Sequence, residues 1–223
     1  MKLEKITRRS YDDACATAHA LDLIGERWAM LVMRELMMGP RRFSDLRAAL
    51  PGISANVLTQ RLEGLEVAAI VRKRRLPPPA AAQIYELTEW GLEAEPILLS
   101  LGKWAVRSPR HDPTLPLSAV GLMLSFRAKF DPARAKGVEV SVSFRFGEEV
   151  FSVGVHKGVL TSERGEADRP DVTVAGSPAA VAGLVYGKAP LKEWEKQGSL
   201  AVTGDRAALK RFADIYEMPP KAG

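Results

Sequence analysis

The sequence predicts an α+β protein in two parts, and three observations indicate this. Residues 43–87 carry two short amphipathic helical patterns followed by two strand patterns. Residues 138–164 alternate apolar and polar side chains with the period of two that is typical of half-buried strands. Between these stretches, residues 107–116 contain three prolines and no periodic apolar pattern, as expected of a semi-rigid linker. We therefore expect two separate domains.

The domain boundaries follow from this linker. We expect a first domain at residues 1–108, a linker at residues 109–116 and a second domain at residues 117–223, sizes that a chain of 223 residues, 46% hydrophobic and 26% charged, can support. No apolar run reaches the roughly 18 residues of a membrane span. The first residues carry cations without a following apolar core, so we expect no secretory signal and a cytoplasmic location.

An apolar helical pattern begins at Cys15 and continues to Leu31. The chain has one cysteine, which excludes an internal disulfide and a Cys-rich metal site. By default, a lone cysteine on such a helix is a small buried core residue. The alternative is a reactive thiolate, favoured by a helix N-terminus and by the nearby cations Arg8, Arg9 and Arg27.

Two short helices are predicted between Phe43 and Leu65. Pro51-Gly52 ends the first helix, and Ser54 stands at the N-cap of the second. The apolar face of the second helix is Val57, Leu58, Leu62 and Leu65. Its outward face carries small and polar residues, namely Ala55, Asn56, Thr59, Gln60, Glu63 and Glu66, with Arg61 at the margin.

A basic hairpin is predicted next. Residues 70–76 form a strand with four consecutive cations, residues 77–82 form a proline-rich loop, and residues 83–87 form the returning strand. From Arg41 to Arg75, eight cations stand against three anions, an excess that equals the net charge of +5 of the whole chain. Helix, turn, helix and basic hairpin in this order predict a winged helix-turn-helix that binds double-stranded DNA. The alternative is an ordinary globular domain with a solvated basic face.

Each polar residue of this segment has an expected role. Ser54 and Arg41 or Arg42 should fasten phosphates, whereas Asn56 and Gln60 should read bases. The remaining members of the expected surface are Thr59 and Arg61 on the second helix and Arg72, Lys73, Arg74 and Arg75 on the wing, which should hold the backbone or the minor groove.

The first half resembles the HxlR-type winged-helix transcriptional regulators, from about Cys15 to Ser108. The motifs that carry the resemblance are Ala20–Trp28, Gly39–Leu46, Gly52–Ser54, Val57–Leu62, Leu65-Glu66 and Tyr85–Gly91. Two departures are Ala16, where the family often has proline after the cysteine, and Ala68-Ala69-Ile70, where a glycine often precedes the wing.

This resemblance implies a regulator, by family habit a repressor, that acts as a homodimer on an inverted repeat. The dimer would form through the N-terminal helix and a helix that starts at Thr88 or Glu89, is kinked or delayed by Pro96, and runs to Trp104. The resemblance also implies that Cys15 could sense oxidants or electrophiles.

The second half predicts a helix, then antiparallel strands, then helices on one side of the sheet. The helices are expected at residues 118–130, after Ser177 and after Asp205. The strands are expected at residues 138–146, 150–155, 159–164, 171–176 and 200–204.

This order resembles the sterol-carrier-protein-2-like (SCP2-like) domain over about Leu117 to Met218. The motifs are Asp171–Val174, Leu184–Lys188 and Gly198–Asp205. The resemblance implies a pocket for a hydrophobic small-molecule effector between sheet and helices. Candidate lining residues are Leu184, Trp194, Leu200, Phe212 and Ile215, and the alternative for each is a place in the core.

No catalytic, metal or cofactor motif is found, so we do not expect an enzyme. His19, His111 and His156 lack the spacing of metal ligands or of a catalytic triad. A second function remains open: a lipid-binding protein whose winged helix serves dimerisation or protein contacts.

Overall fold

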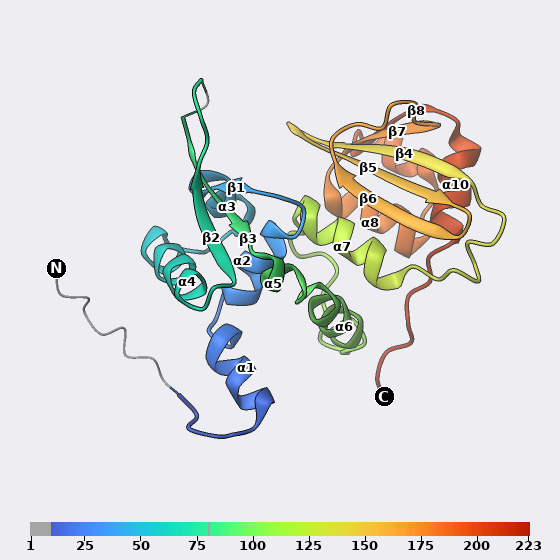
Figure 1. Cartoon of the computed structure of the whole chain (residues 1–223). Coiled ribbons are helices and arrows are strands. Elements are labelled where there is room, and N and C mark those ends of the chain that lie inside the picture. The colour runs from blue at the N-terminus through green and yellow to red at the C-terminus, as the bar shows by residue number, and fades with distance from the viewer. Residues whose placement is uncertain (1–9, 80) are drawn as a thin grey trace. The chain divides into compact units, whose positions relative to one another are not determined.

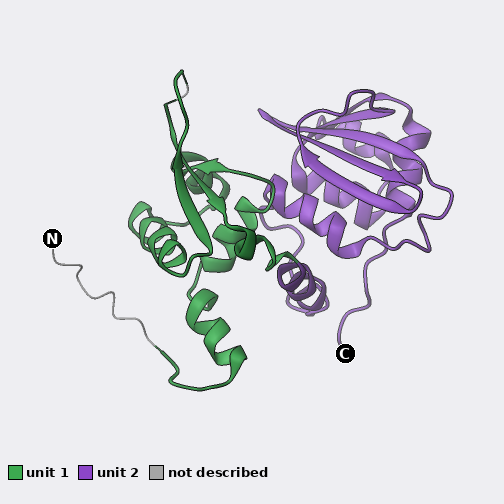
Figure 2. Ribbon diagram, viewed as in Figure 1, with its two compact units in different colours: residues 1–95 green, residues 96–223 purple. Residues whose placement is uncertain are grey.

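The computed structural model describes residues 10–79 and 81–223. The chain divides into two compact units, residues 1–95 and 96–223 (Figure 2). The predicted domain boundaries at residues 108 and 117 stay a prediction. No helix in the described part of the chain combines the length and apolar character needed to cross a membrane.

The first unit is a small helical domain with a three-stranded sheet (Figure 1). Its helices are α1 (Ala16–Ile24), α2 (Ala29–Leu36), α3 (Phe43–Ala49), α4 (Ala55–Val67) and α5 (Glu89–Leu92). The strands β1 (Arg41–Arg42), β2 (Val71–Arg75) and β3 (Gln83–Leu87) pair antiparallel in the order β1-β3-β2. The core is formed by fully buried side chains of α2, α3 and α4, such as Val32, Leu46 and Leu58.

The apolar pattern from Cys15 to Leu31 predicted one helix, and this prediction is wrong. The helix ends at Ile24, and a new one begins at Ala29. The chain turns at Gly25, whose N–H donates to the carbonyl of Leu21 (2.8 Å). A Cβ at position 25 would lie only 2.4 Å from that oxygen, so the tight turn requires glycine. The spacing of apolar residues alone cannot reveal the break at Gly25, because both helices keep an apolar face.

The region after the wing contains two helices. Thr88 caps α5 by accepting a hydrogen bond from the N–H of Gly91 (3.0 Å). The second helix, α6 (Glu95–Ala105), groups with the second unit and has Pro96 in its first turn, the delayed start that the sequence predicted.

The second unit confirms the predicted α+β fold class. Its strands are β4 (Val140–Phe146), β5 (Glu149–His156), β6 (Val159–Arg164), β7 (Val172–Gly176) and β8 (Leu200–Gly204), in the order β6-β5-β4-β7-β8. Only β4 and β7 pair in parallel. The helices are α7 (Ala119–Lys129), α8 (Pro178–Gly187), α9 (Leu191–Lys196) and α10 (Arg206–Asp214), and Figure 1 shows α7, α8 and α10 on one side of the sheet.

An aromatic cluster fills the space between this sheet and its helices. Phe126 of α7 contacts the rings of Phe144, Phe212 and Tyr216 at centroid distances of 5.6, 5.2 and 5.1 Å. All four side chains are fully buried. Such tilted and edge-on pairs stabilise a core beyond the area that they bury.

A short C-terminal tail returns to the end of α6 within the second unit. The ammonium of Lys221 donates to the carbonyls of Val106 and Ser108, each at 3.1 Å. The N–H of Ala222 donates to the carbonyl of Arg107 (2.7 Å). The last residues of this unit are therefore held against the segment that follows α6.

Candidate nucleic-acid interface

Helix α4 has one buried face and one exposed polar face. Ser54 caps it by accepting a hydrogen bond from the N–H of Val57 (3.2 Å). Leu58, Leu62 and Leu65 are buried, as the sequence predicted, whereas Val57 is half-buried. On the opposite face, the side chains of Asn56, Thr59 and Gln60 are exposed. This face can therefore offer amide and hydroxyl groups to base edges.

The three arginines expected to contact DNA outside the wing differ in accessibility. Arg42 is exposed at the start of α3. Arg41 is only 8% exposed, and its guanidinium lies 3.7 Å from the fully buried carboxylate of Glu35. Arg61 makes an ion pair with Glu26 (3.1 Å). Of the two arginines expected to hold phosphate at this end, Arg42 is the better placed.

The four wing cations lie on two different faces of the hairpin, because successive side chains of a strand point to opposite faces. Arg72 stands directly opposite Glu86, and Lys73 stands opposite Tyr85. The ammonium of Lys73 lies 5.6 Å from the Tyr85 ring centroid and 3.8 Å from the Glu66 carboxylate. The run of cations is therefore not one continuous patch.

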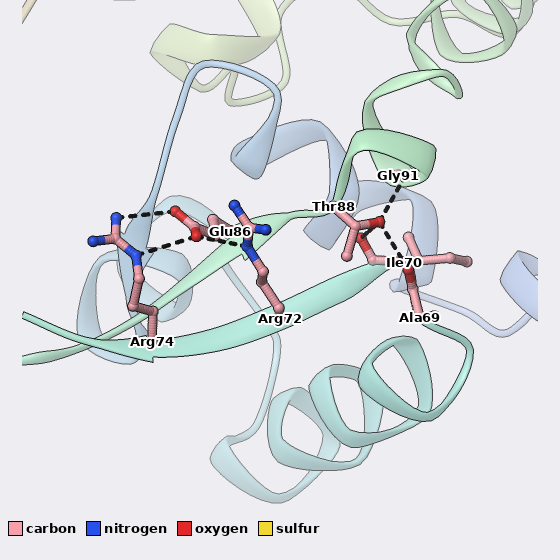
Figure 3. Close-up of polar contacts among 7 residues, drawn as sticks. All are labelled: Ala69, Ile70, Arg72, Arg74, Glu86, Thr88 and Gly91. Carbon is pink, nitrogen blue, oxygen red and sulfur yellow. Dashed lines mark hydrogen bonds and ion pairs between the residues drawn. The ribbon is translucent and has the colours of Figure 1, made fainter.

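Glu86 holds both arginines of its face (Figure 3). Its Oε1 accepts hydrogen bonds from Nε of Arg72 (2.7 Å) and Nε of Arg74 (3.2 Å), and its Oε2 accepts one from Nη2 of Arg74 (3.1 Å). The Glu86 side chain is 12% exposed, against 62% and 50% for the two arginines. The hydrogen bond from Arg74, followed by that from Arg72, lowers the pKa of the Glu86 carboxyl despite its burial.

The base of the wing is fixed by Thr88 (Figure 3). Its hydroxyl donates to the carbonyl of Ala69 (2.7 Å) and accepts from the N–H of Gly91. A Cβ on Gly91 would lie 2.3 Å from the Ile70 carbonyl oxygen. These contacts link the residues that follow α4 to the start of α5 at the base of the wing.

Neither Glu86 nor Thr88 was predicted as a member of the site. The run of cations was evident in the sequence, but the pairing of Arg72 and Arg74 with Glu86 depends on the hairpin register. The predicted loop of residues 77–82 would have placed Glu86 opposite Lys73. In the structure the loop is residues 76–82, a shift of one residue that places Glu86 opposite Arg72.

Cys15 is exposed at the N-cap of α1. Its thiol pKa is lowered, first by the backbone N–H of Ala18 and then by that of Thr17. Arg8 and Arg9, which were expected to assist, lie outside the described residues. The default expectation of a buried core cysteine is wrong for this chain.

The second unit contains a cavity of about 430 Å³. Its apolar wall includes Leu191 and Leu209, and Lys188, Arg206 and Lys210 bring charge to it. Of the expected pocket residues, Leu184 alone is among those that line the cavity. The others lie elsewhere: Leu200, Phe212 and Ile215 are at most 4% exposed in the core, and Trp194 packs against Gly183.

No group of three or more His, Cys, Asp or Glu side chains within residues 10–79 and 81–223 is placed to hold a metal ion.

The comparisons with known proteins agree with this geometry. Residues 23–112 match the family model of the HxlR-like helix-turn-helix. The HTH-type transcriptional regulator YvaP of Bacillus subtilis (strain 168) is 38% identical over 86 residues, which are 39% of this chain and 80% of YvaP. The chain belongs to the HxlR-like helix-turn-helix family. The HxlR-like resemblance seen in the sequence is thereby confirmed, and with it a DNA-binding transcriptional regulator.

Solved structures are similar to each half. The reduced form of the transcriptional regulator YodB from B. subtilis is 33% identical and covers 45% of this HxlR-like chain and 100% of that chain, with a TM-score of 0.40. Residues 122–222 match the family model of the alkyl sulfatase C-terminal domain. The inverting sec-alkylsulfatase Pisa1 from Pseudomonas sp. is 21% identical over 44% of this chain and 16% of that chain, with a TM-score of 0.41. The family match of the second half is consistent with the SCP2-like domain that the sequence predicted.

Proposed function

We propose that this protein is a cytoplasmic repressor that binds an inverted DNA repeat as a homodimer. The observation that carries the proposal is the exposed face of α4, with Asn56, Thr59 and Gln60 beside a basic hairpin. A helix of this kind enters the major groove with its N-terminal residues, and the hairpin cations hold the adjacent backbone.

Two helices with unburied apolar faces support the homodimer. Neither α1 nor α6 contains a buried residue. Leu21 of α1 is 47% exposed, and Trp104 of α6 is 73% exposed. Large apolar side chains gathered on a helix face are typical of an interface, because their burial against a second copy removes them from water.

The direct test is fluorescence anisotropy of a labelled duplex from the regulated upstream region against a scrambled duplex, at several salt concentrations. We expect the specific complex to be tighter by at least about 10³ at physiological salt. Gln60→Ala should weaken it by about 1–3 kcal/mol and relax sequence preference. Equal, weak binding to both duplexes would contradict sequence-specific recognition.

The proposal also includes a small-molecule effector that binds the second unit. The cavity lined by Leu184, Leu191 and Leu209 supports it, because an apolar wall with a few charged groups is typical of a small-molecule site. Native mass spectrometry of the purified protein should detect an apolar ligand. A ligand found together with an absence of any salt-dependent duplex binding would instead favour a lipid-binding protein whose winged helix serves dimerisation.

Cys15 is the second candidate for control. Its exposure and its lowered pKa both favour a thiolate. Peroxide or a quinone should change the DNA affinity of the wild type and leave that of Cys15→Ser unchanged. An equal response in both proteins would exclude Cys15 as the sensor.

A further inference from the structure

One carboxylate in the wing occupies the guanidinium groups of two arginines. Glu86 accepts from Nε and Nη2 of Arg74 and from Nε of Arg72, so one carboxylate takes three hydrogen bonds from two guanidinium groups. Carboxylates and phosphates are recognised by guanidinium groups through the same paired N–H geometry. Both anions therefore compete for the same donors.

We propose that Glu86 acts as an internal competitor of the DNA backbone and restrains the affinity of the wing for DNA. The proposal rests on the proposed function, because it concerns how tightly the same interface holds phosphate. A phosphate that engages Arg74 through its Nε and Nη2 edge must displace Glu86, whose side chain is only 12% exposed.

The geometry separates the wing cations by the donors that they retain. Arg74 gives a two-nitrogen edge to Glu86, whereas Arg72 gives only Nε and keeps both terminal nitrogens available. Lys73 faces the opposite side of the hairpin and lies near Glu66. Arg75 makes no ion pair with any described residue. Arg74 is therefore the cation whose contribution to DNA binding is most reduced by a partner within the protein.

The first test replaces the charge of Glu86 and keeps its shape. We expect Glu86→Gln to bind a random duplex about three- to tenfold more tightly than the wild type, because a neutral amide competes less with phosphate for the guanidinium of Arg74. If one more phosphate is contacted, the slope of log affinity against log salt should also steepen by about 0.9. The operator should gain by a similar factor, since phosphate contacts carry no sequence information.

A matched control separates this local effect from net charge. Glu195 also accepts two hydrogen bonds from one guanidinium, that of Arg206, each at 2.7 Å, and it lies in the second unit. Glu195→Gln changes the net charge by the same amount and should leave DNA affinity unchanged. If both variants tightened binding equally, or if a folded Glu86→Gln bound no more tightly than the wild type, the proposal would be overturned.

Alanine variants of the wing provide a second measurement that does not require Glu86→Gln to fold. The loss of affinity for random duplex should be smaller for Arg74→Ala than for Arg75→Ala. Glu86 already occupies Arg74, so Arg74 contributes less to phosphate binding than Arg75 does. Equal losses would overturn the proposal. A wild-type protein that binds no duplex at any salt concentration would instead contradict the proposed function itself.

Discussion

Ala69 adopts a backbone conformation that L-residues rarely take. Its φ of +58° lies in the left-handed region, directly after α4. The N–H of Ala69 donates to the Glu66 carbonyl and that of Ile70 donates to the Leu65 carbonyl, the paired closure that usually places glycine at this position. The wing is thus anchored by a strained residue.

Replacement of this residue should stabilise the fold. We expect Ala69→Gly to raise the free energy of unfolding by about 0.5–1 kcal/mol, since relief of the left-handed strain, about 1–2 kcal/mol, exceeds the entropy lost by glycine, about 0.5–1 kcal/mol. Urea unfolding measures the change. Ala68→Gly is the matched control. Ala68 has a φ of −76°, so the same substitution there should lower the free energy of unfolding.

Lys129 is the second residue with a measurable consequence. Its ammonium donates to the hydroxyl of Ser125 (2.8 Å) and lies 4.7 Å from the Tyr186 ring centroid. Burial lowers the pKa of Lys129 to about 8. Because the folded pKa is below that of the unfolded chain, the unfolded state binds more protons between these two values, and stability rises with pH in that window.

The expected gain is about 1–2 kcal/mol between pH 7 and pH 9.5. Urea unfolding of the full chain at these two pH values measures it. Lys129→Met should flatten the pH dependence, apart from contributions in the same direction from Lys188 and Cys15, whose pKa values are also lowered. Tyr186 and Tyr216, whose pKa values burial raises, contribute in the opposite direction. An unchanged pH profile in Lys129→Met would contradict the assignment.

At the scale of the element, α6 carries a stripe of exposed apolar side chains. Ile97, Leu101 and Trp104 are 57%, 44% and 73% exposed, at spacings of four and three residues that place them on one face. If α6 forms the proposed homodimer interface, we expect Trp104→Glu to produce a monomer in sedimentation velocity and to weaken operator binding strongly. Lys103→Glu, off this stripe, is the control. A dimer that survived Trp104→Glu would locate the interface elsewhere.

Elements with strong local signals were predictable from the sequence. Ser54, the leucine spacing and the polar outward face defined α4, and strict alternation defined the strands of the second unit. The break at Gly25 was not predictable, because apolar spacing continues across it. The pairing of Glu86 with Arg72 and Arg74 and the position of the cavity depend on strand register and on helix packing, which no local pattern encodes.

At the scale of the whole molecule, the two compact units should respond to different ligands. A ligand that binds only the folded state raises the unfolding temperature of the part that it binds. In differential scanning calorimetry, we expect operator duplex to raise a transition assigned to residues 1–95 more than that of residues 96–223, which it reaches only through the proposed α6 dimer contact. A single transition that moves as one would show that the two units unfold together.

The tail that returns to α6 also bears on how such a chain could be assembled. Lys221 and Ala222 bind the carbonyls of residues 106–108, so the two ends of the sheet-and-helix module between them, residues 109–220, lie close together. A module with adjacent ends can be grafted, excised or circularly permuted without rerouting a strand of its host. Residues 106–108 are therefore a suitable position at which to join this module to another DNA-binding protein.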